Sequence, residues 1–209
     1  LMHDVRRGMG LHEDYNRGLN KAIFVTGGPG SGKDIVIREA IAESKSKEFN
    51  YIQIQRVYES QFIKNHLPII INGPAEDIDS ITKIKQMLES FGYETMMVFV
   101  DTSNKASRER NQRLSRMMVE SVRAEKWSIA QQNKNLFENM FNNFIHFDNS
   151  GDIESIEEDI TRTYQIINNF LNEQSVEYLS YDWFKKQGRL NFDNLFKINE
   201  NVKKDSKQI

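Results

Sequence analysis

The sequence predicts an α/β fold in which a parallel sheet of five strands is covered by helices on both faces. Between residues 22 and 147, short apolar runs alternate with longer stretches of helical periodicity, the pattern of strands joined by crossover helices. The first apolar run passes directly into a glycine-rich turn and then into an amphipathic stretch. We therefore expect a layered domain whose first strand is followed by a turn with an unusual backbone.

Apolar runs flanked by turn residues or charges give the expected strands, which cover residues 22–26, 50–55, 67–72, 94–101 and 143–147. Longer, helix-like stretches alternate with these strands, as crossover helices do. The sheet is therefore expected to be parallel throughout.

Helical spacing of apolar residues predicts the helices. In the helix after the glycine-rich turn the apolar positions are Ile35, Ile37 and Ile41, and in the helix after Pro74 they are Ile78, Ile81, Ile84 and Leu88. Gly92 is expected to end the second of these helices as its C′ residue. Residues 106–140 predict either one long helix or two, and residues 153–171 predict a last amphipathic helix.

Length and composition predict one domain with short extensions. The chain has 209 residues, no cysteine and a formal charge of -2, so a disulfide-stapled scaffold and a strongly basic nucleic-acid binder are both disfavoured. No apolar run reaches the roughly 20 residues of a membrane span, so we expect a cytoplasmic location and no membrane partner. We expect an N-terminal extension over 1–20, the main domain over 21–171 and a helical C-terminal extension over 172–209. An aromatic cluster between residues 178 and 196 caps the core or contacts a partner.

The glycine-rich turn is the most informative segment. In KAIFVTGGPGSGKD, Gly27, Gly32 and Lys33 fit the pattern G-x-x-x-x-G-K between a strand and a helix. Glycines allow successive amides to point inward, and the helix N-terminus adds partial positive charge, so the turn predicts a phosphate-binding loop. The residues expected to contact a nucleotide here are Gly27, Gly28, Gly30, Ser31, Gly32, Lys33 and Asp34.

Asp34 departs from the usual pattern, in which a Ser or Thr hydroxyl follows the lysine and reaches Mg²⁺. A carboxylate is a hard oxygen ligand, so Asp34 is a candidate metal ligand, and Asp101 at the end of the fourth predicted strand is a second. The alternative for Asp34 is an acidic residue that only favours the helix start.

Arginines follow the fourth predicted strand in MMVFVDTSNKASRERNQRLSR. Residues three or four apart share a helix face, so Arg113 is expected beside Arg110 and Arg116, while Arg108 lies elsewhere. Such arginines can stabilise charge on a transferred phosphoryl group, and Arg110 and Arg113 are our candidates for this role. The alternative is a solvated charged helix.

A polar turn follows the last predicted strand in NNFIHFDNSGD. Ligands of open parallel sheets lie beyond the carboxyl ends of the strands, so Asp148, Asn149 and Ser150 are expected to contact the nucleotide base if the last strand neighbours the first. The alternative is a plain turn before a capped helix.

Together, GGPGSGKD, VFVDTS with the arginines after it, and FDNSG resemble, in that order, the small P-loop kinases of the zeta-toxin and polynucleotide-kinase type. The chain also resembles bacteriophage proteins in its general look, which suggests a host cytoplasm. We expect the acceptor hydroxyl to belong to a nucleotide, a nucleic acid or a small molecule. The kinase resemblance covers residues 22–171 and implies ATP with Mg²⁺ as donor, a hydroxyl acceptor, and an acidic base near the end of the second strand. That stretch carries Gln53 and Gln55, and the nearest acid is Glu59, our candidate base.

We therefore expect an ATP-dependent kinase that transfers the γ-phosphoryl group to a hydroxyl. The alternative is a nucleotide-binding structural or assembly protein, such as one of a phage virion, with little or no turnover. Lys33 and the arginines favour the enzyme, while Asp34 and the missing acid on the second strand favour the alternative.

Overall fold

The computed structural model describes residues 21–43, 50–53, 68–90, 92–151 and 153–172. In chain order, its elements are β1 (Lys21–Gly27), α3 (Lys33–Glu43), β2 (Asn50–Gln53), β3 (Ile69–Pro74), α5 (Ile78–Ser90), β4 (Glu94–Asp101), α6 (Asn104–Gln112), α7 (Glu120–Met140), β5 (Asn143–Asp148) and α8 (Ile153–Asn172). Strands thus alternate with helices along the chain, as the apolar runs predict.

The strands form one sheet in the order β2-β3-β1-β4-β5, and every pairing within it is parallel. β1 is the central strand, with Phe24 opposite Ile71 of β3 and Met97 of β4. All of its residues are buried, which accounts for its unbroken apolar run. The predicted α/β class with a parallel sheet is confirmed.

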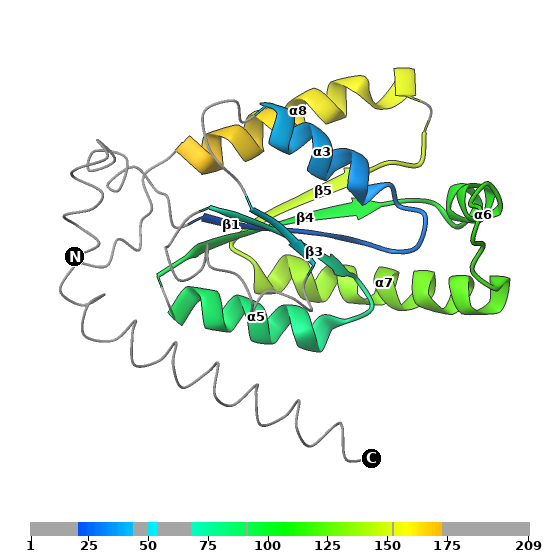
Figure 1. The fold of residues 1–209 in the computed structure, drawn as a ribbon, viewed down its shortest axis with the longest axis horizontal. Coiled ribbons are helices and arrows are strands. Elements are labelled where there is room, and N and C mark those ends of the chain that lie inside the picture. Colours follow the sequence, from blue (N-terminus) through cyan, green and yellow to red (C-terminus); the bar gives the residue numbers. More distant parts are fainter. Residues whose placement is uncertain (1–20, 44–49, 54–67, 91, 152, 173–209) are drawn as a thin grey trace, which may run out of the picture.

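Helices cover the sheet on both faces: α5 and α7 lie on one face, and α3 and α8 on the other (Figure 1). The core is accordingly divided in two. One cluster joins Phe24 and Phe99 of the sheet to Leu88 of α5 and Phe137 of α7. The other joins strand residues of the opposite face to α3 and α8. Alternate residues of each central strand point into different clusters, so these strands need apolar side chains at almost every position.

The α5 pattern is confirmed, since Ile81, Ile84, Met87 and Leu88 are buried. Gly92 has φ 80° and its amide donates to the Glu89 carbonyl at 2.9 Å, so its predicted role at the end of this helix is also confirmed. The predicted face of α3 is wrong in part. Val36 and Ile37 are buried there, whereas Ile35 is 46% exposed. The helix starts directly after the glycine turn, and this start fixes the face that meets the sheet.

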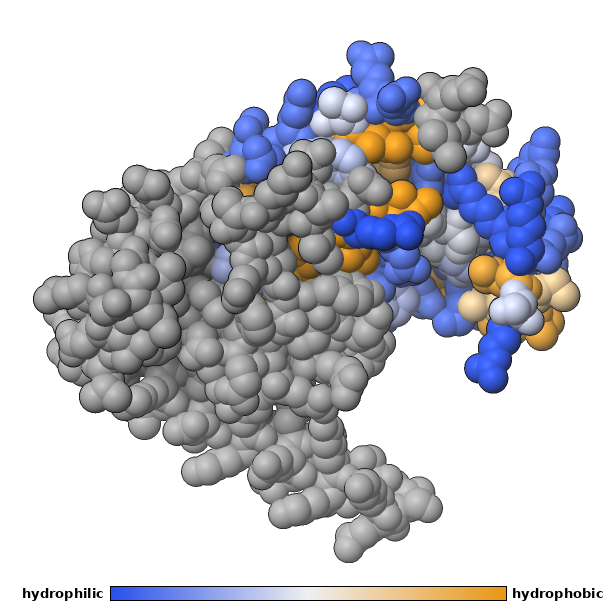
Figure 2. Space-filling model, turned by 45° about the horizontal axis from the view of Figure 1, so that its top comes forward, coloured by the Kyte–Doolittle hydropathy of each residue, from blue (hydrophilic) through white to orange (hydrophobic). Residues whose placement is uncertain are grey.

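The arginine-rich region forms two helices rather than one. α6 ends at Gln112 with Arg113 as its C-cap, so Arg113 and Arg116 do not continue the helix face of Arg110 as the spacing predicts. Asn111 bridges the connection, because its side chain donates to the Met118 carbonyl at 2.8 Å and accepts from the Met118 amide at 3.0 Å. Apolar side chains reach the surface where α6 passes into α7, at the right of the molecule (Figure 2), and they include Leu114, Met117 and Val119.

Several predicted features lie outside the described residues. They are the end of the second strand with Gln55, the candidate base Glu59, and the extensions over 1–20 and 173–209. Within the described part of the chain, no helix is both long and apolar enough to cross a membrane.

Candidate functional site

The predicted phosphate-binding loop, residues 27–33 and called the phosphate loop below, leaves the end of the central strand and turns into the first residue of α3. Gly30 and Gly32 have φ of 69° and 81°, values that L side chains rarely adopt. The Ser31 amide donates to the Gly28 carbonyl at 3.2 Å, and the Ile35 amide to the Gly32 carbonyl at 2.9 Å. The loop therefore closes as a tight turn on the helix N-terminus, the local geometry that the motif predicts.

Neighbouring side chains hold the carbonyls of this loop. The Ser107 hydroxyl donates to the Pro29 carbonyl at 2.6 Å, and Arg110 Nη1 donates to the Gly30 carbonyl at 3.0 Å. The Asn149 side chain donates to the Ser31 carbonyl at 2.7 Å. Successive carbonyls thus point outward toward α6 and the β5 turn. Among the described residues, no hydrogen bond is seen from the amides of Gly30, Gly32, Lys33 or Asp34, which are donors that an anion can use.

Close packing restricts the first residue of the loop, Gly27. A Cβ at Gly27 would lie 2.4 Å from the Val100 carbonyl oxygen and 2.5 Å from Ser31 Oγ, so any other residue would displace the loop. Ser31 is 1% exposed, and its hydroxyl has no hydrogen-bond partner among the described residues. A buried hydroxyl without a partner costs free energy in the folded protein.

Arg110 points its guanidinium at backbone atoms. Besides its bond to Gly30, Nη1 lies 3.5 Å from the Ser31 carbonyl oxygen and 3.4 Å from Thr102 Oγ1, and Nη2 donates to the Asn149 carbonyl at 2.6 Å. Burial and then the nearby Arg113 charge lower the pKa of Arg110 from its usual value. One side chain of α6 thereby connects the phosphate loop to the turn after β5.

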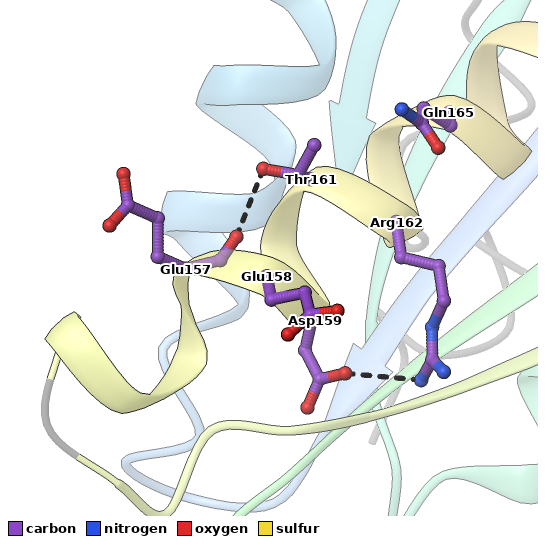
Figure 3. Close-up of a pocket in the computed structure, with 6 residues that line it drawn as sticks. All are labelled: Glu157, Glu158, Asp159, Thr161, Arg162 and Gln165. Carbon is purple, nitrogen blue, oxygen red and sulfur yellow. Dashed lines mark hydrogen bonds and ion pairs between the residues drawn. The ribbon is translucent and has the colours of Figure 1, made fainter.

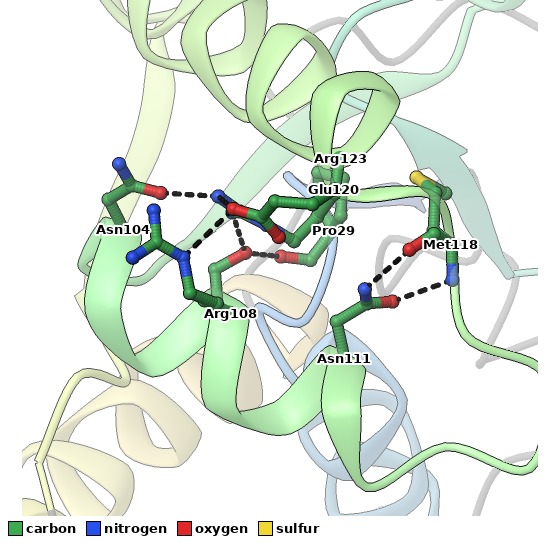
Figure 4. A network of polar contacts seen from close by, with 8 residues as sticks. Pro29, Asn104, Arg108, Asn111, Met118, Glu120 and Arg123 are labelled. Atoms are coloured by element: carbon green, nitrogen blue, oxygen red, sulfur yellow. Dashed lines mark hydrogen bonds and ion pairs between the residues drawn. The ribbon is translucent and has the colours of Figure 1, made fainter.

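A fully buried arginine on α7, Arg123, forms a polar network with α6 (Figure 4). Its Nη1 donates to Ser107 Oγ at 2.8 Å, and its Nη2 donates to Asn104 Oδ1 at 2.6 Å. Glu120 supplies the counter-charge and also pairs with Arg108 at 2.8 Å. Hydrogen bonds from Arg123 and then Arg108 lower the pKa of Glu120 to about 2. This network fixes α6, and through Ser107 it also reaches the Pro29 carbonyl.

The turn after β5 lies beside the phosphate loop, although β5 pairs with β4 and not with β1. The last strand is therefore not a neighbour of the first, as the expected contact required. The side chain of Asn149 joins the β5 turn to the phosphate loop instead. Ser150 Oγ accepts from the Ser103 amide at 2.7 Å and also donates to Asp148. Asp148 and Ser150 thus cap this edge of the sheet, and their contact with a nucleotide base stays a prediction.

Asp101, the predicted metal ligand at the end of β4, already has several donors. Gln131 and the Thr102 amide donate to Oδ1 at 2.6 and 2.8 Å, while Lys134 and His146 contact Oδ2 at 3.2 and 2.8 Å. Burial raises the pKa of Asp101, but these contacts, led by His146, outweigh it and hold the pKa well below its usual range. The carboxylate ties β4 to α7 and β5, an arrangement that does not fit direct metal binding while these bonds last.

The other side of the loop is the end of β3, where Asn72 pairs in register with Val25 of the central strand. Asn72 is 6% exposed. Beyond it, Asn133 donates to the Ala75 carbonyl at 2.9 Å, and Lys126 pairs with Glu76 at 2.7 Å. Asp77 accepts the Ser80 amide at 3.1 Å, so it caps α5 as expected of an acid at a helix start.

The remaining candidates are placed as follows. Lys33 is the first residue of α3, and Asp34 is an exposed first-turn residue. Arg113 is exposed at the end of α6. Within the described ranges, no group of three or more His, Asp and Glu side chains is arranged to hold a metal ion. Asp34 therefore remains the candidate metal ligand whose carboxylate is exposed beside the loop.

Sequence reasoning missed Ser107 and Arg123. Arg123 shares a helical face with Ala130 and Phe137, which are buried in the core. An arginine at such spacing is a signal of a buried ion pair, with Glu120 three residues earlier as the obvious partner. Ser107 carried no comparable signal, since its role depends on the approach of Pro29, which lies 78 residues away.

A hollow of about 710 Å³ lies elsewhere on the molecule and is lined by Glu157, Glu158, Asp159, Thr161, Arg162 and Gln165 (Figure 3). All of these residues belong to α8. Its charged groups are surface side chains, with Arg162 and Asp159 paired at 3.2 Å. Because no phosphate-loop residue lines this hollow, we assign it no part in the candidate site.

No protein-family model matches the chain, and no curated protein matches its sequence. Among solved structures, the chain is similar to a shikimate kinase from Bacteroides thetaiotaomicron, with 14% identity, a TM-score of 0.46, and coverage of 70% of this chain and 98% of that one. It is also similar to Chaetomium thermophilum Kti12 in complex with ADP-AlF3, with 15% identity, a TM-score of 0.48, and coverage of 70% and 98%. It is similar to APE1195 as well, with 13% identity, a TM-score of 0.48, and coverage of 75% of this chain and 98% of that one. Similarity at this level does not extend to activity or substrate.

Proposed function

We propose that the protein is an ATP-dependent phosphotransferase that moves the γ-phosphoryl group of ATP to a hydroxyl. One observation carries the proposal. Three successive carbonyls of the phosphate loop are held outward by Ser107, Arg110 and Asn149 at the start of α3. Because each amide points opposite the preceding carbonyl, the amides of Gly30 and Gly32 point away from these contacts, beside the N-terminus of α3, which supports a site for a phosphate chain.

The residues at this point suit a nucleotide triphosphate. The amides of Gly30 and Gly32 offer donors, and Lys33 adds a full positive charge at the first residue of α3. Magnesium, when bound, would neutralise part of the phosphate charge, and Asp34 follows Lys33 where a ligand hydroxyl usually stands.

In the proposed transfer, the acceptor oxygen forms a bond to the γ-phosphorus while the bond from that phosphorus to the β–γ bridging oxygen breaks. ADP leaves with the bridging oxygen. The acceptor proton passes to a base, for which Glu59 is the candidate from the sequence. Lys33 and Arg113 would stabilise the charge on the transferred group, since both lie beside the loop or at the end of the helix that contacts it.

The finer assignment rests on the sequence. The order of the phosphate loop, the β4 end with its arginines, and the β5 turn supports a kinase of the zeta-toxin or polynucleotide-kinase type. A nucleotide or nucleic-acid acceptor and a bacteriophage source belong to the same proposal.

A second candidate function is a nucleotide-binding structural or assembly protein with little turnover. The observation that favours it is Asn72 at the end of β3, beside the central strand. Many nucleotide-hydrolysing P-loop proteins carry at this position an acid that orders magnesium and water, and an amide cannot take up a proton or give the same charge.

Two measurements separate these functions. Calorimetric titration of the full chain with ATP and Mg²⁺ tests binding, and transfer of radiolabel from γ-labelled ATP to nucleosides, oligonucleotides and sugars tests turnover. Binding with transfer supports the kinase, while tight binding without transfer to any of these acceptors supports the assembly protein. A chain that binds no nucleoside triphosphate contradicts both.

A further inference from the structure

We infer that Arg110 is a positioning residue that sets the backbone of the phosphate loop, and that it is not a ligand of the transferred phosphate. Its effect on nucleotide binding rests on the proposed function, whereas its effect on the loop does not. The observation behind this inference is that the guanidinium reaches backbone carbonyls on two separate segments, the phosphate loop and the β5 turn.

Peptide planarity explains how a contact to carbonyls orients amides. The described chain has no cis peptide bond, so each carbonyl points opposite the amide of the next residue. Fixing the Pro29 carbonyl fixes the Gly30 amide, and fixing the Gly30 carbonyl fixes the Ser31 amide. Fixing the Ser31 carbonyl in turn fixes the Gly32 amide. Glycine residues resist such rotation poorly, and Gly30 and Gly32 therefore need these outside contacts to keep one conformation.

Arg110 is the central member of this set. Its Nη1 donates to the Gly30 carbonyl, the middle one of the three, at 3.0 Å. Its Nη2 donates to the Asn149 carbonyl at 2.6 Å and so also positions Asn149, whose side chain donates to the Ser31 carbonyl. If the guanidinium turned toward a phosphate instead, it would break these charge-assisted bonds and free the peptide units that they fix. Arg113 is exposed and serves as the comparison residue.

α6 can act as a fixed support because it is itself held. Arg123 is fully buried and donates to both Ser107 and Asn104 of α6, with Glu120 as its counter-charge. The contacts of Ser107 and Arg110 with the loop start from the same helix, only one turn apart. The loop is thereby fixed to a helix that Arg123 holds in place, rather than to a freely rotating side chain.

The first test needs no nucleotide. Backbone ¹⁵N order parameters of Gly30, Ser31 and Gly32 are measured in the free full-length chain, for the parent and for Arg110→Ala, Arg110→Lys and the matched control Arg113→Ala. We expect order parameters of about 0.85 in the parent and Arg113→Ala, and below about 0.6 in Arg110→Ala. Arg110→Lys should lie between them because ammonium lacks the planar fork. Parent-like order parameters in Arg110→Ala overturn the inference.

The second test compares ADP with a non-hydrolysable ATP analogue. A ligand of the γ-phosphate matters only for the analogue, whereas a residue that shapes the loop matters for both nucleotides. We expect Arg110→Ala to weaken both by a similar factor of about tenfold or more, the effect of losing one or two charge-assisted hydrogen bonds. A loss confined to the ATP analogue overturns the inference.

Two checks keep these results readable. Thermal unfolding and the dispersion of amide signals outside residues 27–33 show whether Arg110→Ala keeps its fold. If it does not, Ser107→Ala tests carbonyl positioning in the same way. We expect that variant to lose backbone order at Gly30, and parent-like order there would count against the inference. A parent that binds no nucleotide contradicts the proposed function while leaving the order-parameter result intact.

Discussion

The two sides of the phosphate loop are built differently. Toward β4 and β5, the loop meets side chains that donate to its carbonyls from α6 and from the turn after β5. Toward β3, Thr26 Oγ1 at the end of β1 donates to the Gly73 carbonyl at 2.8 Å, and the Ala75 amide lies 3.4 Å from the Gly27 carbonyl. Side chains thus hold the loop carbonyls on the β4 side, whereas on the β3 side the contacts join the end of the central strand to its neighbour.

The largest expected effect tests this contrast with two lysines. Lys33→Ala should lower the affinity for ATP with Mg²⁺ by about 100-fold or more, because the ammonium meets phosphates in a site partly shielded from water. Lys126→Ala removes a lysine of the β3 side that pairs with Glu76, and its ATP affinity should match the parent. Calorimetry on both variants measures the contrast. Equal affinities for parent and Lys33→Ala would show that the lysine contacts no phosphate.

A second variant changes the backbone conformation of the loop. Gly32→Ala should destabilise the fold by about 1–3 kcal/mol, because φ of 81° is strained for alanine and the new Cβ would lie 2.5 Å from the Asn149 side-chain nitrogen. The matched control is Gly28→Ala, whose Cβ would come no closer to a neighbour than 3.3 Å, at the Ala130 Cβ. Urea unfolding compares the two. A control that costs as much as Gly32→Ala would argue against the importance of positive φ.

The β4 end should respond to pH through Asp101. The folded-state pKa of Asp101 lies below its unfolded-state pKa of about 4. The stability that Asp101 contributes is therefore present above about pH 4 and is lost as the pH falls toward the folded-state pKa. The stability deficit of Asp101→Asn relative to the parent should therefore be full at pH 7 and smaller at pH 3. Urea unfolding at the two pH values measures it, with Asp77→Asn on the β3 side for comparison. A deficit that stays the same at both pH values would remove the electrostatic explanation.

The smallest expected effect concerns Asp34. If its carboxylate contributes to the magnesium shell, Asp34→Ala should weaken ATP binding by several-fold with Mg²⁺ and strengthen it slightly without the metal, since the carboxylate repels phosphates. Asp34→Ser should keep the metal dependence. Titrations of ATP with and without Mg²⁺ decide between this role and that of a helix-start acid, for which parent and alanine variant would show equal metal dependence.

Local patterns predicted much of this structure. The alternation of apolar runs with helical stretches predicts the parallel sheet, and the glycine spacing predicts a tight turn at residues 27–33, because both depend on neighbours in the chain. The exposure of Ile35 was not predictable from spacing alone, since the register of a short helix is set by its start. The carbonyl contacts of Arg110 could not be predicted from the sequence either. An arginine on a polar helix looks the same in sequence whether it meets a phosphate, water or a peptide group.

The contact between Asn149 and Ser31 also has a consequence for biosynthesis. These residues lie 118 positions apart, and the contact of Arg110 with Gly30 spans 80. Because such long-range contacts form only after the intervening chain has been made and packed, the phosphate loop is among the last parts of the domain to mature. A ribosome-bound chain that stops before residue 149 would carry the whole glycine motif and still lack one of the contacts that shape it. Nucleotide binding is thus expected to appear late in synthesis, when the fifth strand has joined the sheet.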